Sequence, residues 1–261
     1  MDRTFFWRKI HSLFGLWFAL FLLEHLFTNS QAALLPDDQW NHFVRAVNFL
    51  HNVPYLHAVE VLLLGVPIVF HAGLGIRYAL TSRINSLPSD GSTPSLPQYA
   101  RNHAYTWQRW TSWILLVGLI LHVGYMRIYR YPVEVQVGNQ VAYVVNIEHK
   151  QGIERLSQEL GVSLVEHKGR LVAQASEFGT ATLLVVRDAF LSPFKCILYT
   201  VFVLAACFHA FNGLWTFMIS WGVILGVRSQ RRMSYLCGGL MVILMFLGLS
   251  AIWGSYWSFR P

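Results

Sequence analysis

The sequence alternates between long apolar stretches and shorter polar segments. Five apolar stretches of about 20 residues or more lie at roughly 12–34, 56–80, 111–130, 194–221 and 235–257. A helix needs about 20 apolar residues to cross a hydrocarbon core ~30 Å thick. The pattern therefore predicts five membrane-spanning helices, three within residues 1–132 and two within residues 190–261.

The segment 133–189 follows a different pattern. VEVQVGNQVAYVVNI (133–147) alternates apolar and polar positions on both sides of a Gly-Asn pair, which is typical of a β-hairpin. GIERLSQELG (152–161) predicts a short amphipathic helix, and TATLLVVRDAF (180–190) predicts either a strand or the entrance to a helix. We interpret 133–189 as a small α+β insertion outside the membrane, and the fold class as an all-α integral membrane bundle of five helices.

The number and distribution of charged residues are typical of a membrane protein. Only 13% of the residues are charged and 54% are hydrophobic, whereas soluble domains carry about 25% charged residues. The net charge of +7 does not indicate nucleic-acid binding, because the basic residues gather at alternate ends of the predicted helices. These residues are Arg3, Arg8 and Lys9, then Arg77, Arg83, Arg101 and Arg109, then Arg228, Arg231 and Arg232. The opposite link, 35–55, carries Arg45 alone, so the positive-inside rule predicts a cytoplasmic N-terminus and an outer C-terminus.

The positions of the three cysteines argue against a disulfide-stabilised protein and against a c-type cytochrome. All of them lie in or beside the predicted helices, so no disulfide framework is expected in the outer loops. The sequence contains no C-x-x-C-H motif, which rules out covalently attached c-type haem.

Four of the eleven histidines lie deep in apolar stretches, one in each of the first four predicted helices: His25, His71, His122 and His209. A single buried histidine often does no more than bond across a helix interface. Ionisable residues inside a membrane are nevertheless rare, costly and usually functional. Four of them on four successive helices therefore indicate a shared purpose.

Distances along the chain sort these histidines by depth. His25 and His122 lie 11 and 10 residues from the proline at the outer end of their spans, which corresponds to ~15–17 Å along a helix. His71 and His209 lie 17 and 16 residues from the corresponding prolines, or ~24–26 Å. The sequence thus predicts two histidines at each of two depths.

Two histidines at one depth on different helices are suited to bind a planar metal complex from both faces. Neutral imidazole is a good ligand for haem iron, and a porphyrin suits an apolar cavity. Zinc is disfavoured, because neither pair supplies the third and fourth ligands that it requires. The pattern predicts two b-type haems forming a path for electrons across the membrane. A proton-relaying transporter and a haem-free scaffold stay open as alternatives.

Several longer motifs carry a resemblance to a known family. They are RKIHSLFG (8–15), LEHLFTN (23–29), VFHAGLG (69–75), WQRWTSW (107–113), LHVGYMRI (121–128) and FHAFNGLWTFMISWGVILGVRSQ (208–230). With these motifs the chain resembles the five-helix, di-haem cytochrome b membrane anchor of succinate:quinone oxidoreductase (succinate dehydrogenase or fumarate reductase). The resemblance covers all five predicted helices.

The resemblance implies a complete ligand set. His71 and His209 would bind the haem nearer the cytoplasm, and His25 and His122 would bind the distal one. It also implies cytoplasmic partners, namely a flavoprotein subunit with FAD and an iron–sulfur subunit. Electrons would pass from these subunits through the chain to a membrane quinone, typically menaquinone. The chain itself would hold no succinate site, and it would lie in a bacterial-type cytoplasmic membrane among its lipids.

Three residues at the cytoplasmic ends of the spans are candidates for contacts with haem propionates or with the iron–sulfur subunit: Ser12, Gln108 and Arg109. Arginine pairs well with carboxylates, although Arg109 is equally suited to anchor lipid headgroups. Glu60 lies 11 residues, or ~17 Å, outward of His71. It is the candidate for delivering protons to quinone, and the alternative is a side chain that extends to the outer headgroups.

Three points stay outside this pattern. Tyr125, Met126 and Arg127 are weaker candidates for lining a quinone pocket near the outer end of the third helix. The segment 133–189 is longer than the corresponding loop of the family, which alters the surroundings of the distal quinone site and leaves the ligand set unchanged. A second redox hypothesis is an anchor for another quinone-linked dehydrogenase, such as a hydrogenase or formate dehydrogenase.

Overall fold

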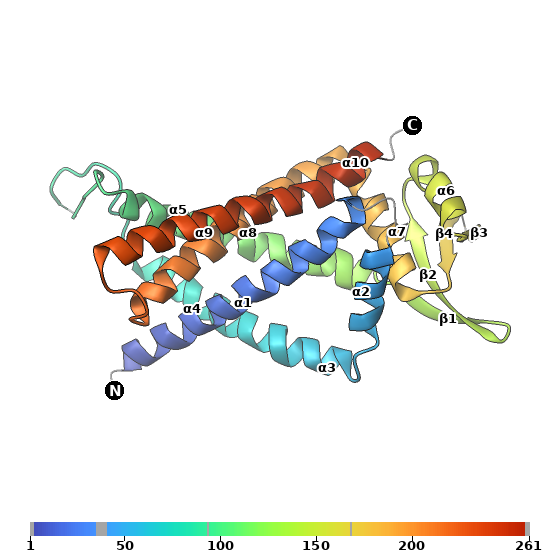
Figure 1. Ribbon diagram of the computed structural model, residues 1–261, viewed down its shortest axis with the longest axis horizontal. Coiled ribbons are helices and arrows are strands. Elements are labelled where there is room, and N and C mark those ends of the chain that lie inside the picture. Colours follow the sequence, from blue (N-terminus) through green and yellow to red (C-terminus); the bar gives the residue numbers. More distant parts are fainter. Residues whose placement is uncertain (1–2, 35–40, 93, 168, 259–261) are drawn as a thin grey trace. The chain divides into compact units, whose positions relative to one another are not determined.

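The computed structural model describes residues 3–34, 41–92, 94–167 and 169–258 (Figure 1). Their elements are α1 (Arg3–Leu34), α2 (Asn41–His51), α3 (Leu56–Glu60), η2 (Val61–Gly65), α4 (Val66–Thr81), α5 (Ala100–His122), η3 (Val123–Tyr129), β1 (Val133–Val137), β2 (Gln140–Ile147), α6 (Lys150–Glu159), β3 (Ser163–His167), β4 (Arg170–Ala175), α7 (Phe178–Phe190), α8 (Pro193–Ser220), α9 (Val227–Leu249), η4 (Ser250–Gly254) and α10 (Ser255–Ser258). The η segments are π-helical. The protein is mostly helical, with one small sheet.

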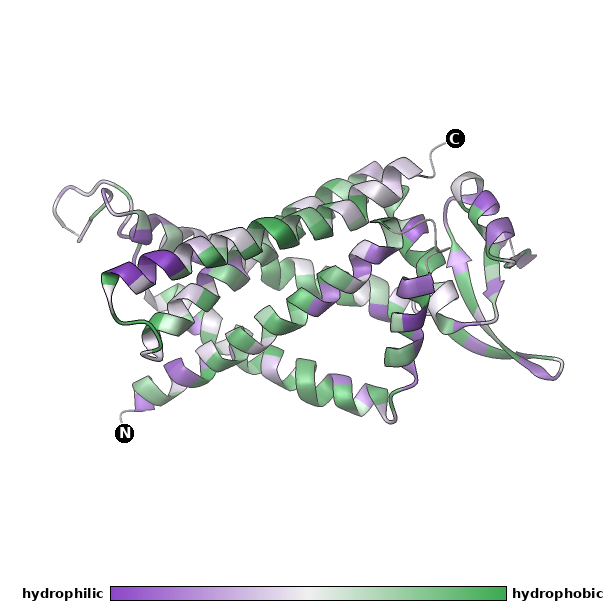
Figure 2. Cartoon of the chain, viewed as in Figure 1, coloured by the Kyte–Doolittle hydropathy of each residue, from purple (hydrophilic) through white to green (hydrophobic). Residues whose placement is uncertain are grey.

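Five helical stretches within the described ranges are long and apolar enough to cross a membrane: Arg3–Leu34, Leu56–Thr81, Ala100–Tyr129, Pro193–Ser220 and Val227–Ser258. This confirms the five predicted spans. The first, third and fifth helices begin earlier than the apolar pattern predicts. Their first turns carry polar and basic residues, as Figure 2 shows for α1 and α9. Membrane thickness limits only the apolar part of a helix, so polar turns can continue it into water.

A π-helical segment interrupts or extends three of the spans. Such segments are rare and occur often at functional sites. In η2 the carbonyl oxygen of Leu63 accepts a hydrogen bond at 2.7 Å from the indole of Trp17, which is on α1. The segment η3 begins directly after His122, so the local backbone is irregular beside one of the predicted ligands.

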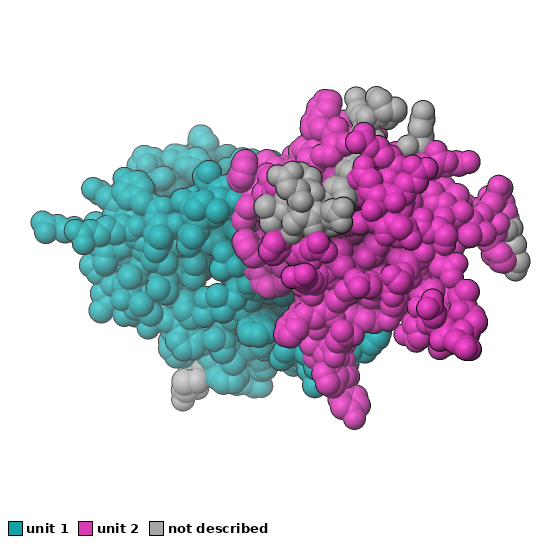
Figure 3. Space-filling model, turned by 45° about the vertical axis from the view of Figure 1, so that its right-hand side comes forward, with its two compact units in different colours: residues 1–23, 57–118, 204–245 teal, residues 24–56, 119–203, 246–261 magenta. Residues whose placement is uncertain are grey.

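The chain divides into two compact units (Figure 3). The first consists of residues 1–23, 57–118 and 204–245, and the second of residues 24–56, 119–203 and 246–261. His71 and His209 belong to the first unit, whereas His25 and His122 belong to the second. Each of the two predicted histidine pairs therefore lies within a single unit.

The segment between the third and fourth spans folds as an antiparallel sheet with two helices, which we call the external module (133–190). The strand order is β1-β2-β4-β3. Gly138, with φ +61°, forms the predicted turn between β1 and β2, and Gly169, with φ +72°, directly precedes β4 in its hairpin with β3. The second hairpin has no counterpart in the sequence analysis. The predicted α+β character is confirmed.

The core of the external module is helix α7. The segment 180–190, for which the sequence allowed a strand or the entrance to a helix, is helical, and nearly all side chains of α7 are buried. α7 packs on β2 and β4 and also on α2, a helix within the link that the sequence analysis described only as a short connection. The Gly179 amide donates to the Asn48 side chain at 2.7 Å. A Cβ on Gly179 would lie 2.4 Å from the Val44 carbonyl oxygen, so only glycine allows this approach of the two helices.

Candidate functional site

The structure brings the rings of His71 and His209 close together in the first unit; we call them the proximal pair. His71 is on α4 and His209 on α8. Their ring centroids are 6.3 Å apart, and the ring planes are inclined by 77°. The depths inferred from sequence grouped the same two residues.

Hydrogen bonds orient both rings of the proximal pair. His71 Nδ1 lies 3.0 Å from the carbonyl oxygen of His11, which can only accept, so Nδ1 carries the proton. His209 Nδ1 lies 3.3 Å from the Thr111 hydroxyl, which itself donates to the Trp107 carbonyl at 2.8 Å. Thr111 therefore accepts from Nδ1. In both rings the unprotonated nitrogen is Nε2, which is the arrangement that metal-binding histidines adopt.

His11 is a third imidazole beside the proximal pair. The sequence analysis gave it no role, but its ring stacks on His71 at 4.1 Å with an angle of 18°. A Cβ on Gly15 would lie 3.2 Å from His71 Cε1, and one on Gly75 would lie 3.4 Å from His11 Nε2. Glycine at these positions makes room for the rings. The signal in the sequence was the spacing H-x-x-x-G, which follows His11, His71 and His209 alike.

The second unit contains the distal pair, His25 on α1 and His122 on α5. Their ring centroids are 5.9 Å apart, and the planes are inclined by 84°. His122 Nδ1 lies 3.1 Å from the hydroxyl of Tyr199 on α8. The Phe202 ring, about one turn further along the same helix, lies 5.8 Å from the His122 ring. The distal pair thus has the same facing arrangement as the proximal pair, in largely apolar surroundings.

Both separations fit an iron ion bound between two imidazoles. Each axial nitrogen lies about 2 Å from the metal, so the two ring centroids of such a pair lie about 6 Å apart. A tetrahedral zinc site does not fit. Within the part of the chain that the structure describes, no membrane histidine belongs to a group of three or more possible metal ligands. The donor sets therefore suit haem and do not suit zinc.

The three residues predicted to contact propionates or the iron–sulfur subunit all form hydrogen bonds within the protein. Gln108 donates to the carbonyl oxygen of His209 at 3.0 Å and accepts from the Asn212 side chain at 2.8 Å. It thereby fixes α5 to α8 beside a ligand candidate. The Ser12 hydroxyl donates to a carbonyl one turn earlier and accepts from the Trp221 indole at 2.9 Å.

Only one of the two terminal guanidinium nitrogens of Arg109 has a hydrogen-bond partner among the described residues. Its Nη2 donates to the carbonyl oxygen of Ala79 at 2.7 Å. Its Nη1 is buried and has no hydrogen-bond partner among the described residues. A buried guanidinium nitrogen in this state is costly, and an anionic group such as a propionate would satisfy it. Of the three candidates, Arg109 best fits that role.

The residues predicted to serve a quinone belong to the second and third spans. Glu60 is half-buried at the end of α3, directly before η2, and belongs to the first unit. Its role as a proton relay stays a prediction. Arg127 lies over the ring of Tyr131 at 3.9 Å, and Tyr125 takes part in the polar network described next. A quinone pocket at these positions likewise stays a prediction.

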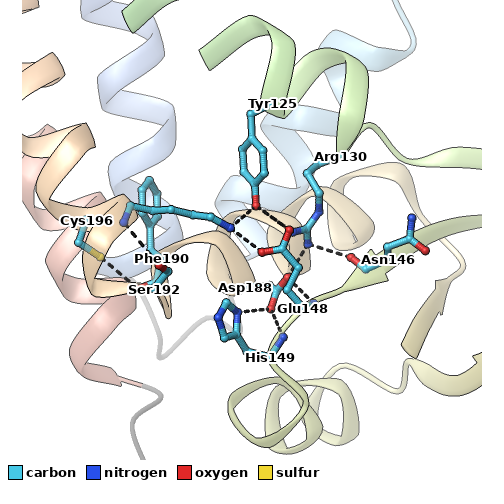
Figure 4. A network of polar contacts seen from close by, with 10 residues as sticks. Tyr125, Arg130, Asn146, Glu148, His149, Asp188, Phe190, Ser192 and Cys196 are labelled. Atoms are coloured by element: carbon cyan, nitrogen blue, oxygen red, sulfur yellow. Dashed lines mark hydrogen bonds and ion pairs between the residues drawn. The ribbon is translucent and has the colours of Figure 1, made fainter. Parts of the chain in front are cut away.

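A polar network connects the external module to the ends of the third and fourth spans (Figure 4). Its centre is Asp188 on α7, a fully buried carboxylate. Asp188 accepts from Arg130 Nη2 at 2.5 Å and from the amides of Glu148 and His149 at 2.9 and 2.8 Å. His149 Nδ1 lies 3.0 Å from Asp188 Oδ1, the oxygen that also accepts from the His149 amide. The sequence gives no sign of this network, because its members come from separate segments.

This network is an ionic junction and does not resemble a metal site. Glu148, His149 and Asp188 lie close enough to share an ion, but Arg130 and Lys195 already supply two positive charges to the two carboxylates. Burial on its own lowers the pKa of Arg130, but the hydrogen bond and charge of Asp188 outweigh it and raise the pKa above its ordinary value. The guanidinium is therefore charged at any physiological pH.

Comparison with known proteins defines the chain further. The five apolar spans make it a multi-pass membrane protein. No family model matches the chain. It is 27% identical over 252 residues to the succinate dehydrogenase cytochrome b558 subunit of Bacillus subtilis (strain 168), covering 96% of this chain and 96% of that protein. The chain is a distant but full-length homologue of that subunit, in agreement with the resemblance found in its motifs.

Proposed function

We propose that the chain is the cytochrome b membrane anchor of a succinate:quinone oxidoreductase. In this function it binds two b haems, one between the proximal pair and one between the distal pair. The observation that carries the proposal is the pair of facing imidazole arrangements, with centroids 6.3 and 5.9 Å apart. The full-length homology to a cytochrome b558 subunit supports it.

The residues of the chain would act mainly by holding imidazoles in place. A b haem with both axial positions filled by histidine transfers single electrons and has no open position for oxygen or substrate. The His11 carbonyl and the Thr111 hydroxyl hold the Nδ1 protons, which keeps Nε2 of the proximal pair available for iron. Gln108 fixes the backbone at His209, and the spare guanidinium nitrogen of Arg109 would bind a propionate.

Electrons would enter and leave at opposite ends of the chain. The distribution of basic residues supports a cytoplasmic N-terminus, so a flavoprotein and an iron–sulfur subunit would bind on that side. FAD and the iron–sulfur clusters would reside in those partners, and the succinate site with them. The distal haem would pass electrons to a membrane quinone, for which menaquinone is the family's typical choice, with Glu60 as the proposed proton relay.

Haem content tests this proposal directly. We expect the purified protein to bind two b haems per chain, measured by a pyridine haemochrome assay and a reduced-minus-oxidised spectrum. The His209→Ala variant should lose or perturb one haem and the His25→Ala variant the other. His167→Ala is the matched control, because His167 is an exposed residue of β3 in the external module, and it should keep both. A colourless wild-type protein would refute the proposal and favour the proton-relaying transporter.

The partner distinguishes the two redox hypotheses. Purification of the intact complex from mild detergent should yield a flavoprotein with covalently bound FAD, together with an iron–sulfur protein. Co-purification of a hydrogenase or formate dehydrogenase subunit instead would assign the chain to another quinone-linked enzyme. The two haems would be unaffected by that outcome.

A further inference from the structure

The polar network of the external module continues toward a ligand of the distal pair. On the third span, His122 and Tyr125 are one helical turn apart, and on α8 Tyr199 and Lys195 are also one turn apart. Residues three or four apart lie on the same face of a helix. The two pairs face each other in register: His122 bonds to Tyr199 at 3.1 Å, and Lys195 donates to Tyr125 at 2.6 Å. We call these four residues the polar ladder.

Glu148 of the external module completes the outer end of the polar ladder. One of its carboxylate oxygens lies 2.5 Å from Lys195 Nζ, and the other accepts from the Tyr125 hydroxyl at 3.2 Å. Arg130 also contacts Glu148 at 2.8 Å and donates to Tyr125 at 2.9 Å. Glu148 is the most exposed of these ionic groups, at 34% of its side chain, against 23% for Lys195 and 1% for Arg130.

The charges of this junction balance closely. Arg130 and Lys195 contribute two positive charges, and Glu148 and Asp188 contribute two negative ones. Partial burial on its own raises the pKa of Glu148, but the hydrogen bond from Lys195 and the charge of Arg130 outweigh it, so the pKa is below its ordinary value. Glu148 is therefore ionised at neutral pH. Removal of any one charge leaves a net charge at the outer end of the polar ladder, about one helical turn beyond His122, where partial burial weakens screening.

We propose that the external module sets the reduction potential of the distal haem, with Glu148 and Lys195 as positioning residues that act through Tyr125 and Tyr199 on His122. The inference rests on the proposed function, because it requires a haem at the distal pair. Reduction adds an electron, so positive charge nearby favours the reduced form and negative charge favours the oxidised form. Hydrogen-bonded neighbours of a ligating histidine also tune its metal.

Charge-changing variants test this inference with opposite expected signs. In Glu148→Gln the two cations lose a negative partner, so the midpoint potential of the distal haem should rise. In Lys195→Gln a positive charge is lost, so that potential should fall. Both would be measured by spectroelectrochemical titration of the intact complex, with the potential of the proximal haem as an internal reference. Glu154→Gln is the matched control, because it removes only an exposed ion pair with Lys150 on α6.

The outcomes separate this inference from a purely structural role and from the proposed function. Loss of packing alone would shift both variants in the same direction, and that result, or no shift in either, would overturn the inference. The double variant Glu148→Lys, Lys195→Glu keeps an ion pair between the two positions and therefore controls for misfolding. The midpoint potential of its distal haem should lie between those of the single variants. A wild-type protein without haem would refute the proposed function, whereas two haems with unshifted potentials would refute only the inference.

Discussion

Replacement of Asp188 by asparagine should loosen the external module from the membrane helices. The carboxylate is fully buried and pairs with Arg130, which is 1% exposed. Removal of one partner from a buried ion pair costs about 3–5 kcal/mol, since the remaining charge stays desolvated. Glu148, 2.8 Å from Arg130 Nη1, would still compensate in part, so we expect the lower end, about 3 kcal/mol. A tenfold change in equilibrium corresponds to about 1.4 kcal/mol, so the module should open roughly 100-fold more often.

Hydrogen exchange of the complex in detergent measures this opening. The reporters are amides of the paired strands β2 and β4, whose core residues Val145 and Ala173 are buried and exchange only when the module opens. The Glu154→Gln variant should change the rate by about twofold or less, because an exposed ion pair contributes about 0.3–0.5 kcal/mol. If the Asp188→Asn variant exchanged no faster than Glu154→Gln, the buried ion pair would not hold the module, and the reasoning would fail.

Three further predictions follow from the site and the module. If haems bind at the proximal and distal pairs as proposed, the near-perpendicular rings would leave the iron d orbitals close in energy. Both ferric haems should therefore give strongly anisotropic low-spin EPR signals, and an ordinary rhombic spectrum would contradict the ring geometry. Gly179→Ala should destabilise the module by about 1–3 kcal/mol, because α2 blocks any Cβ there. Gly239→Ala serves as the control, since nothing lies within 4 Å of its Cβ position. Equal melting temperatures of the two variants would contradict the packing. The pKa of Glu148 is lowered from its ordinary value of 4.5, so its ion pairs stabilise the module above pH 4.5 and this stabilisation is lost as the pH falls further. Hydrogen exchange in the module should then accelerate in wild type but not in Glu148→Gln.

Much of the fold follows from local patterns. Apolar stretches of sufficient length predict the spans, since every backbone group inside a membrane must bond within its own helix. The Gly-Asn pair predicts the first hairpin, because glycine readily supplies the positive φ that a two-residue turn needs. Helix α2 and the second hairpin were missed. α2 is stabilised by its contact with α7, 131 residues away at the Asn48–Gly179 bond, and a pattern read locally contains no such partner.

The candidate site, like the fold, can be predicted from the sequence only in part. Each ligand candidate is visible in the sequence because a histidine in an apolar helix is conspicuous, and helix length supplies its depth. Their neighbours are harder to recognise. Thr111 and Tyr199 are ordinary residues of apolar helices until the fold places them beside an imidazole. Arg109 and Gln108 were grouped by position, and only their bonds show that Gln108 serves the backbone while Arg109 keeps a free donor.

The close approach of α2 and α7 has a consequence for biosynthesis. The α2 segment leaves the ribosome long before Gly179, so it waits without its partner while the third span and the sheet are made. The final contact forms only after the chain has passed residue 179, and non-local contacts of this kind form slowly. Quality-control proteases would meet α2 uncovered during that interval. Completion of the module is therefore a natural checkpoint, at which an immature chain becomes resistant to degradation at α2.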